Sequence, residues 1–470
     1  MKLNKTEWII FCTIAFAFIL IQARGLSHIA PGDENVYYYM AKSIDEGQLP
    51  YKDFFYAHPP LHIFILSIII RIFGLNFAIL KFASLLALLI SSFFLYKISL
   101  ELFKNRLHDK NANVMASLSL LLFLSSFEVM FKATFSMGIN YSLMFLMISF
   151  YFTFSKKYFV GGVLAGIAGL TRFYALVPLL IFFIFLFIKK LEEHKIKDFY
   201  NLLVGFIMTF GAVFALLVLL FGHNFTDAVI QYHFLKPKLP NQRMIVYKNI
   251  LKEDWMVLLS FSLSLFIKNK KRFQLFYFVA FGYLIFLLSL NVPAEFYFSI
   301  SFPFMAIIGA YAIVDLIRSI KLNYLARYAL IFLLSLLFLW NTTADVVFLE
   351  KYVFLDFKPL SKMVAKVSST SPDKQIFGDD SIVPLLALMS NRSIALNYID
   401  SNEMRFTSGL TNFYLFKYDL DSANLSYIIF RKNMGLHQIN EFRKYASSRC
   451  SLEEQYSDYI EGYFLMYKCY

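Results

Sequence analysis

Charged residues are scarce in this chain. Asp, Glu, Lys and Arg together make up 16% of the sequence, whereas 59% of it is hydrophobic. This composition excludes an ordinary soluble globular domain and is typical of a membrane protein. Apolar stretches long enough to cross about 30 Å of hydrocarbon recur along most of the chain. We therefore predict a polytopic α-helical membrane protein.

Cysteine is also rare, and the motifs of several enzyme classes are missing. The three cysteines include no closely spaced pair of the kind that binds zinc. The sequence has no glycine-rich phosphate loop ending in Lys and Ser or Thr, and no Gly-x-Ser-x-Gly motif. These absences argue against nucleotide-driven pumping. They predict an activity without a cofactor, and nothing in the sequence supports a divalent metal.

Clusters of Lys and Arg separate the apolar stretches and predict the topology. They lie at residues 97–110, 156–157, 189–197, 268–272 and 318–327. By the positive-inside rule these clusters face the cytoplasm, together with Lys2 and Lys5. About eleven spans fit between them, near residues 7–24, 77–96, 113–130, 138–154, 158–171, 173–188, 201–222, 255–267, 273–291, 297–315 and 325–341. This predicts a multi-pass plasma-membrane protein with its N-terminus inside and its C-terminus outside.

The apolar run Leu61–Phe73 is too short to span a bilayer comfortably, and a crossing there would break the parity of the spans. We therefore interpret it as a helix in the outer interface. Residues 25–76 then form a first outer loop within a catalytic membrane domain of residues 1–341.

Residues 342–470 have a different character, with frequent charges of both signs. The net charge of +13 therefore belongs to the membrane part, where it reflects topology and not nucleic-acid binding. β-like runs at 375–377, 393–397, 425–430 and 462–466 alternate with helical patterns at 381–389 and 437–447. They predict a small extracytoplasmic α/β domain. Cys450 and Cys469 both fall in it, and their spacing leaves open whether they form a disulfide.

The predicted topology places ionisable residues from scattered positions near the outer interface. They are Asp33, Glu34, His58, Lys132, Arg172 and Glu295. Charges near a membrane are costly, so a cluster of both signs indicates a site for a charged, lipid-borne ligand. The alternative is that each is an ordinary charge at the end of a span, reaching toward water.

Such a site could displace a phosphate from a sugar carbon. Asp33 or Glu34 would act as the base toward an acceptor hydroxyl, while His58, Arg172 and Lys132 would stabilise the leaving phosphate. Pro59 and Pro60 fix the backbone after His58, although the same run is also typical of a plain turn and helix start.

The order of motifs in the first outer loop resembles a known family. Asp33-Glu34 is followed by aromatic residues at 37–39, by the stretch 47–53, by His58-Pro59-Pro60-Leu61 and by Phe73-Gly74. This order resembles the first loop of the GT-C membrane glycosyltransferases, specifically the protein O-mannosyltransferase and aminoarabinose transferase group. Residues 166–172 and Glu295-Phe296-Tyr297 are further similarities, so that the resemblance spans most of residues 1–320.

The resemblance implies a GT-C fold, a polyprenyl-phosphate sugar donor and an outward-facing C-terminal domain. It assigns the base, or the positioning of the acceptor, to Asp33 with Glu34 beside it. Substrate-binding roles are then expected for His58, Lys132, Arg172, Glu295 and Tyr297.

The chain departs from the family pattern at two points. His58 stands where relatives often carry Lys. The stretch ending in Asn140 lacks an Asp that relatives tend to have, so that a second acid is either missing or supplied by Glu128 or Glu295.

The sequence thus predicts a glycosyltransferase that moves a sugar from a polyprenyl-phosphate donor to an extracytoplasmic protein, lipid or glycan, with inversion. Two alternatives from other classes stay open. One is a transporter or flippase of a lipid-linked glycan, although no midplane polar elements or repeats support it. The other is a non-catalytic assembly or sensor protein.

Overall fold

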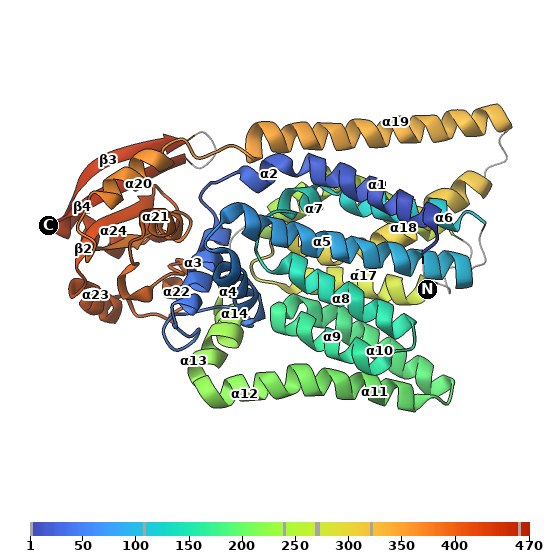
Figure 1. The fold of residues 1–470 in the computed structure, drawn as a ribbon, viewed down its shortest axis with the longest axis horizontal. Coiled ribbons are helices and arrows are strands. Elements are labelled where there is room, and N and C mark those ends of the chain that lie inside the picture. Colours follow the sequence, from blue (N-terminus) through green and yellow to red (C-terminus); the bar gives the residue numbers. More distant parts are fainter. Residues whose placement is uncertain (1–2, 107–109, 238–240, 268–272, 320–322, 459–461) are drawn as a thin grey trace. The chain divides into compact units, whose positions relative to one another are not determined.

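The computed structural model describes residues 3–106, 110–237, 241–267, 273–319, 323–458 and 462–470 (Figure 1). The chain forms two compact units. One, the helical unit, comprises Met1–Leu26, Lys81–Ala215 and Leu239–Lys351. The other, the mixed unit, comprises Ser27–Leu80, Leu216–Lys238 and Tyr352–Tyr470.

Apolar helices dominate the chain up to residue 348. Each predicted span overlaps at least one of them: α1 (Lys5–Ile21), α5 (Phe77–Leu100), α6 (Ala112–Leu124), α8 (Ile139–Phe154), α9 (Tyr158–Thr171), α10 (Leu176–Glu192), α11 (Ile196–Phe206), α12 (Ala212–Phe221), α16 (Trp255–Leu263), α17 (Gln274–Ser289), α18 (Phe302–Ser319) and α19 (Tyr324–Phe348).

Five helical stretches within the described residues are long and apolar enough to cross a membrane. They are Phe77–Lys104, Phe173–Glu192, Ile196–Phe221, Phe302–Ser319 and Tyr324–Val353. The membrane class is thereby supported, whereas the eleven crossings and the orientation stay predictions. The basic residues at 268, 270–272 and 321, which carry part of the orientation argument, lie outside the described residues.

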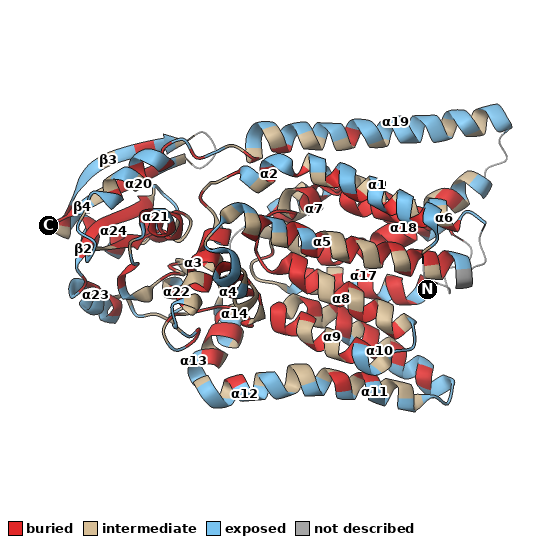
Figure 2. Ribbon diagram, in the orientation of Figure 1, coloured by how far each residue is buried: buried red, intermediate tan, exposed pale blue. Residues whose placement is uncertain are grey.

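The surface of the helical unit also fits a lipid environment. Figure 2 shows α19 as mainly exposed, and its exposed residues include Leu325, at 80% relative accessibility, and Trp340, at 68%. Large apolar side chains on the outside are unfavourable in water but favourable against lipid.

Glycines allow close packing of α9 against α11. A Cβ atom at Gly162 would lie 1.9 Å from the carbonyl oxygen of Leu202, and one at Gly205 would lie 2.3 Å from that of Phe159. Only glycine permits such an approach of two helix backbones. This packing fixes the end of α9, where Arg172 follows.

The mixed unit contains a four-stranded sheet in the order β1-β2-β4-β3. The strand β1 (Gln375–Gly378) runs parallel to β2 (Leu425–Arg431), which pairs antiparallel with β4 (Gly462–Cys469), and β4 pairs antiparallel with β3 (Cys450–Asp458). The helices α20 (Leu360–Ser368), α21 (Val383–Ser390), α23 (Phe413–Asp421) and α24 (Asn440–Arg449) accompany the sheet. Its core includes Phe377, Ile428 and Phe442.

The small C-terminal α/β fold is thus confirmed, and its extracytoplasmic placement stays a prediction. Two details differ from the sequence prediction. Residues 393–397 form no ladder strand, because only Ile394 bridges to Ile376 before a short 3-10 turn at Ala395–Asn397. The strand β3 was not expected, and its first residue, Cys450, forms a disulfide with Cys469.

The first-loop helices α3 (Asp33–Asp45) and α4 (Leu61–Phe73) belong to the mixed unit. The N–H of Gly32 donates to the carbonyl oxygen of Ser381 over 2.8 Å, and the N–H of Ile394 donates to the hydroxyl of Tyr39 over 3.1 Å. By its contacts, the loop therefore groups with the C-terminal segment. The predicted chain-order division into residues 1–341 and 342–470 stays a prediction.

Candidate active site

Asp33 lies in the first turn of α3 and its side chain is exposed. The turn before it is fixed from two sides. The Gly32 backbone is bonded to Ser381, and the Asn35 amide donates to the carbonyl oxygens of Ala30 and Gly32 over 2.9 and 3.1 Å. A carboxylate at a helix N-terminus is also stabilised by the helix dipole. Asp33 is therefore an accessible carboxylate on a rigid support.

Glu34, the second member of the acidic pair, is in a different environment. Its side chain is only 3% exposed, and Tyr38 donates a hydrogen bond to its Oε2 atom over 3.4 Å. An external hydroxyl group can reach Asp33 but not a carboxylate enclosed in this way. The structure thus distinguishes two residues that are equivalent in the sequence.

Four further carboxylates from the C-terminal segment interact electrostatically with Asp33, and sequence reasoning missed all of them. They are Asp379, Asp380, Asp400 and Glu403. A usable signal was present, because Asp379 and Asp380 directly follow β1, which has a parallel neighbour. The carboxyl ends of parallel strands are a common place for binding sites.

These acids have raised pKa values. Burial raises the pKa of Asp379. The hydrogen bonds that its Oδ1 accepts from the Ser381 N–H and hydroxyl, over 3.1 and 2.6 Å, act in the opposite direction and lower this pKa, but burial has the larger effect. Burial and then repulsion by neighbouring carboxylates raise the pKa of Asp380 well above the ordinary value. Burial also raises the pKa of Asp400, although the nearby Arg405 opposes this effect. The surroundings of Asp33 are therefore strongly acidic and resist further ionisation.

His58 lies between α3 and α4 in sequence, and its ring is half-buried. Its ring centroid is 5.3 Å from that of His233, whose Nε2 atom is 2.7 Å from the carbonyl oxygen of Ala57. Tyr51 donates a hydrogen bond to the carbonyl oxygen of His58 over 2.6 Å. Helix α4 begins directly after Pro60, as the sequence predicts. His58 is therefore held by its neighbours within the mixed unit.

The other predicted site residues lie in the helical unit. Arg172 follows α9, is 3% exposed and donates from Nη2 to the carbonyl oxygen of Met137. Lys132 ends the short helix α7 (Phe127–Lys132), with its Nζ atom 4.5 Å from the ring centroid of Phe135 and 5.7 Å from that of Phe296. Cation–π contacts of this kind attract a charged group to the face of an aromatic ring.

Glu295 and Tyr297 come from a single 3-10 segment, Glu295–Ile300, that packs beside α7. Glu295 accepts a hydrogen bond from the Asn249 amide over 2.9 Å. The Tyr297 ring lies 4.1 Å from that of Tyr174, two residues after Arg172. The structure thus brings the predicted residues of this unit onto neighbouring elements. It divides the predicted set between two units, so the convergence of all of them stays a prediction.

Asn140 explains one departure from the family pattern. Its Nδ2 atom donates to the Ser84 hydroxyl over 2.9 Å and to the carbonyl oxygens of Lys132 and Ala133 over 2.9 and 3.1 Å. An aspartate has no N–H to give to a carbonyl. Glu128, one of the two candidates for a second acid, is 3% exposed and interacts with Lys132 and Glu295. Among the described residues, no group of His, Cys, Asp and Glu has an arrangement that could hold a metal ion.

Comparisons with known proteins agree with the family resemblance and with the fold described above. Residues 57–227 match the family model described as dolichyl-phosphate-mannose-protein mannosyltransferase, a stretch that contains His58 and Arg172. ArnT from Cupriavidus metallidurans is similar over its whole length, both bound to undecaprenyl phosphate and in the apo state. Each of these two crystal structures has 11% sequence identity, a TM-score of 0.65 and coverage of 98% of either chain. No curated protein matches the sequence significantly.

The family match over residues 57–227 and the fold shared with ArnT make this chain similar to the class of GT-C membrane glycosyltransferases. Within this class, the resemblance to the protein O-mannosyltransferase and aminoarabinose transferase group, first seen in the outer loop, is confirmed. At 11% identity the likeness to ArnT itself shows a shared fold.

Proposed function

We propose that this chain is a glycosyltransferase that takes a sugar from a polyprenyl-phosphate donor and attaches it to a hydroxyl of an extracytoplasmic acceptor. The observation that carries this proposal is the exposed Asp33 carboxylate, held at the start of α3 in a chain with the fold of ArnT. The solved ArnT structure contains undecaprenyl phosphate, which supports a donor of the same lipid class.

In the proposed reaction Asp33 accepts the proton of the acceptor hydroxyl as the oxygen attacks the anomeric carbon. The bond between that carbon and the phosphate oxygen breaks, and polyprenyl phosphate leaves with the electron pair. Attack opposite to the leaving group inverts the anomeric configuration. His58, Lys132 and Arg172 stabilise the negative phosphate, while Glu295 and Tyr297 help to position the donor.

The activity is proposed to need no metal or other cofactor. Cations of the protein itself can balance the phosphate charge, as the buried Arg172 and the aromatic-bound Lys132 illustrate. Transfer by the purified protein should therefore persist in excess EDTA. A loss of transfer that added Mg²⁺ or Mn²⁺ restores would contradict this part of the proposal.

The experiment that tests the function starts from a strain that lacks the gene. Its membranes should accumulate a polyprenyl-phosphate sugar, which can be extracted, isotopically labelled and returned to the purified full-length protein in nanodiscs together with parental envelope material. We expect the label to move from the lipid donor to a different product, the glycosylated acceptor. Free polyprenyl phosphate should appear at the same time. Movement of intact labelled lipid across a vesicle bilayer without cleavage would instead indicate a flippase. Neither cleavage nor movement would favour an assembly or sensor protein.

The proposal also requires that both groups of site residues face outward. In a Cys12→Ser background that keeps the native disulfide, single cysteines can be placed at the exposed Lys52, at Asn291 and at the exposed Lys195. An impermeant maleimide applied to intact cells should label the first two, and Lys195→Cys only after permeabilisation. Labelling of Lys195→Cys in intact cells would reverse the orientation and remove the support for an outer site.

A further inference from the structure

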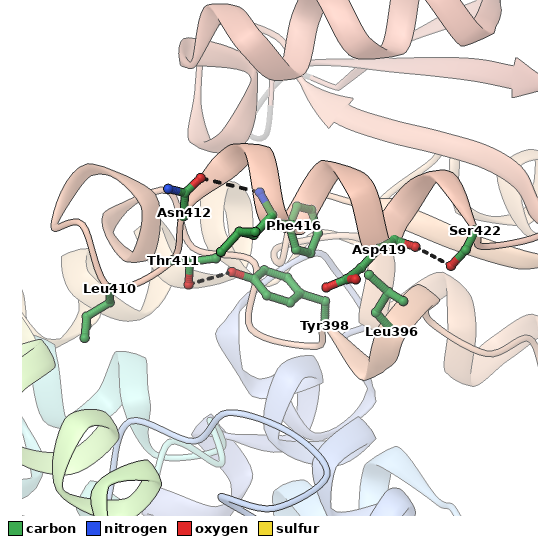
Figure 3. Close-up of a pocket in the computed structure, with 9 residues that line it drawn as sticks. Leu396, Tyr398, Leu410, Thr411, Asn412, Phe416, Asp419 and Ser422 are labelled. Carbon is green, nitrogen blue, oxygen red and sulfur yellow. Dashed lines mark hydrogen bonds between the residues drawn. The ribbon is translucent and has the colours of Figure 1, made fainter.

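Two adjoining cavities form a groove in the mixed unit. The first has a volume of about 490 Å³ and lies along α23, as Figure 3 shows, with Tyr398 and Phe416 among its lining residues. The second, of about 330 Å³, extends toward the first outer loop. They share four lining residues: Leu396, Tyr398, Leu410 and Thr411. We call the two together the α23 groove, and both volumes lie in the range of about 300–1,000 Å³ that is usual for ligand sites.

The backbone of this groove is strained. Tyr51, Leu396 and Asn397 line it and have φ angles of 68°, 56° and 50°. A left-handed conformation is unfavourable for residues such as Tyr and Leu, and it persists only where surrounding structure enforces it. Two separate chain segments therefore hold disfavoured conformations at the same cavity. Such clustering is typical of sites whose shape serves binding.

The groove combines flat rings with hydrogen-bonding groups of both kinds. Tyr398 donates to the Thr411 hydroxyl over 3.2 Å, so that its ring is fixed as one wall. Carboxylates of Asp419, Asp53 and Asp227 supply acceptors, and amides of Asn412 and Asn224 supply donors as well. Sugar hydroxyls both donate and accept, and the apolar face of a sugar ring packs on aromatic rings. This lining therefore fits a saccharide.

Arg405 lines the second cavity of the groove. Its guanidinium carbon lies 4.1 Å from the ring centroid of Phe55 and 4.0 Å from that of Tyr398. Arg405 is only 8% exposed. Its Nη1 atom donates to the carbonyl oxygen of Asp400 over 2.7 Å. Its Nε atom is buried and donates to none of the described residues. A buried N–H without a partner is costly and indicates a place for an external acceptor oxygen.

Other occupants fit the groove less well. A lipid chain would have to bury the lining carboxylates without satisfying them, which is unfavourable. A peptide that binds by strand addition needs a free strand edge, and none of the lining residues belongs to β1–β4. The groove is linked to Asp33 through one residue: Arg405, which lines the groove, bonds to Asp400, and Asp400 interacts electrostatically with Asp33.

We propose that the α23 groove binds the acceptor and that the acceptor is a saccharide chain, whose hydroxyl beyond Arg405 is presented toward Asp33. This inference rests on the proposed glycosyltransferase function and adds the chemical class of the acceptor. The rings and amides of the groove bind successive sugar units, and the Arg405 Nε–H donates to an oxygen of the unit nearest to Asp33.

The test uses the full-length protein in nanodiscs on an array of defined cell-surface oligosaccharides, beside an array of synthetic unglycosylated peptides. Leu410→Trp fills the part shared by both cavities, and the matched control Met434→Trp places the same bulk at a half-exposed position outside the groove. A second pair, Leu415→Gln and Tyr418→Gln, compares a lining with a non-lining residue of α23. We expect binding of at least one oligosaccharide, weakened tenfold or more by Leu410→Trp and Leu415→Gln but not by the controls.

Binding to no oligosaccharide, binding that Leu410→Trp leaves intact, or binding to peptides instead would overturn the inference. Its failure is distinguishable from failure of the proposed function. If labelled sugar is transferred but Leu410→Trp leaves the acceptor KM unchanged, the function stands and the groove assignment falls. If oligosaccharide binding depends on the groove but no transfer occurs, the groove is a saccharide site and the glycosyltransferase proposal falls.

Discussion

The mixed unit and the helical unit both contain predicted site residues, but the surroundings of the charged side chains differ between them. In the mixed unit, Asp33 is exposed and interacts electrostatically with four other carboxylates. In the helical unit, Lys132 lies against aromatic rings and Arg172 is buried beside a backbone carbonyl. The described neighbours of Asp33 include several carboxylates, whereas those of Lys132 and Arg172 include aromatic rings and a backbone carbonyl. In the proposed reaction, proton removal from the acceptor then belongs to the mixed unit. Stabilisation of the phosphate is proposed to use His58 of the mixed unit as well as Lys132 and Arg172 of the helical unit.

The largest effect should follow from changing the exposed acid. Asp33→Asn keeps the size of the side chain but removes the base, and we expect transfer to fall by about 10²–10⁴-fold, the usual contribution of a general base. Release of labelled sugar from the lipid donor measures it. Glu46→Gln, also an exposed acid near the end of the same helix, is the control and should transfer normally. Full activity of the purified Asp33→Asn protein would exclude Asp33 as an essential base.

Next in size is the effect on the cationic side. His58→Ala and Arg172→Ala should each weaken binding of the polyprenyl-phosphate donor roughly ten- to a hundred-fold, because a charged partner of a phosphate contributes about 1.5–3 kcal/mol. Binding of the labelled donor to protein in nanodiscs measures this, with Lys195→Ala as an exposed control. If both variants bind the donor as tightly as the parent, the phosphate lies elsewhere and this part of the proposed reaction fails.

A smaller effect should come from restoring the family's acid. Asn140→Asp replaces an amide that donates to two carbonyl oxygens by a group that cannot donate, and this should destabilise the helical unit by about 1–3 kcal/mol. Denaturant unfolding in detergent measures it, with the partly exposed Asn113→Asp as control. Unchanged stability together with higher transfer activity would mean that position 140 serves catalysis and not the support of Lys132.

The smallest effect concerns the acidic surroundings of Asp33. Because burial raises the pKa of Asp379, Asp380 and Asp400 in the folded protein, their contribution to stability is fully present below the ordinary carboxyl pKa and is lost as the pH rises through the folded values. Stability should therefore decline from acidic toward neutral pH. Asp380→Asn should flatten this decline and raise the Tm near pH 8 by about 2–4 °C, or about 1 kcal/mol. A parallel pH profile in parent and variant would contradict the assignment.

The sequence predicted what depends on local pattern. Helix α4 has the predicted bounds, because Pro60 and Gly74 delimit it. The residue pattern alone left open which of Asp33 and Glu34 is the base, and only the family resemblance favoured Asp33, since burial of Glu34 is a property of the packed unit. The interaction of Asp400 with Asp33 could not be predicted, because contacts between residues so distant in the chain leave no periodic signal, and the signal for Asp380 was its position directly after β1. β3 was missed because its exposed polar residues give only weak alternation.

The bond between Tyr39 and Ile394 joins residues 355 positions apart. During synthesis, the first outer loop therefore cannot form its contact with Ile394 until the chain has been made as far as that residue. Closing so long a loop is slow, and the unpaired segment is exposed meanwhile to aggregation and proteolysis. A consequence follows for quality control. A product that stops before the sheet should contain all the spanning helices and yet lack a finished loop, so that premature termination yields an inert protein and not an unregulated enzyme.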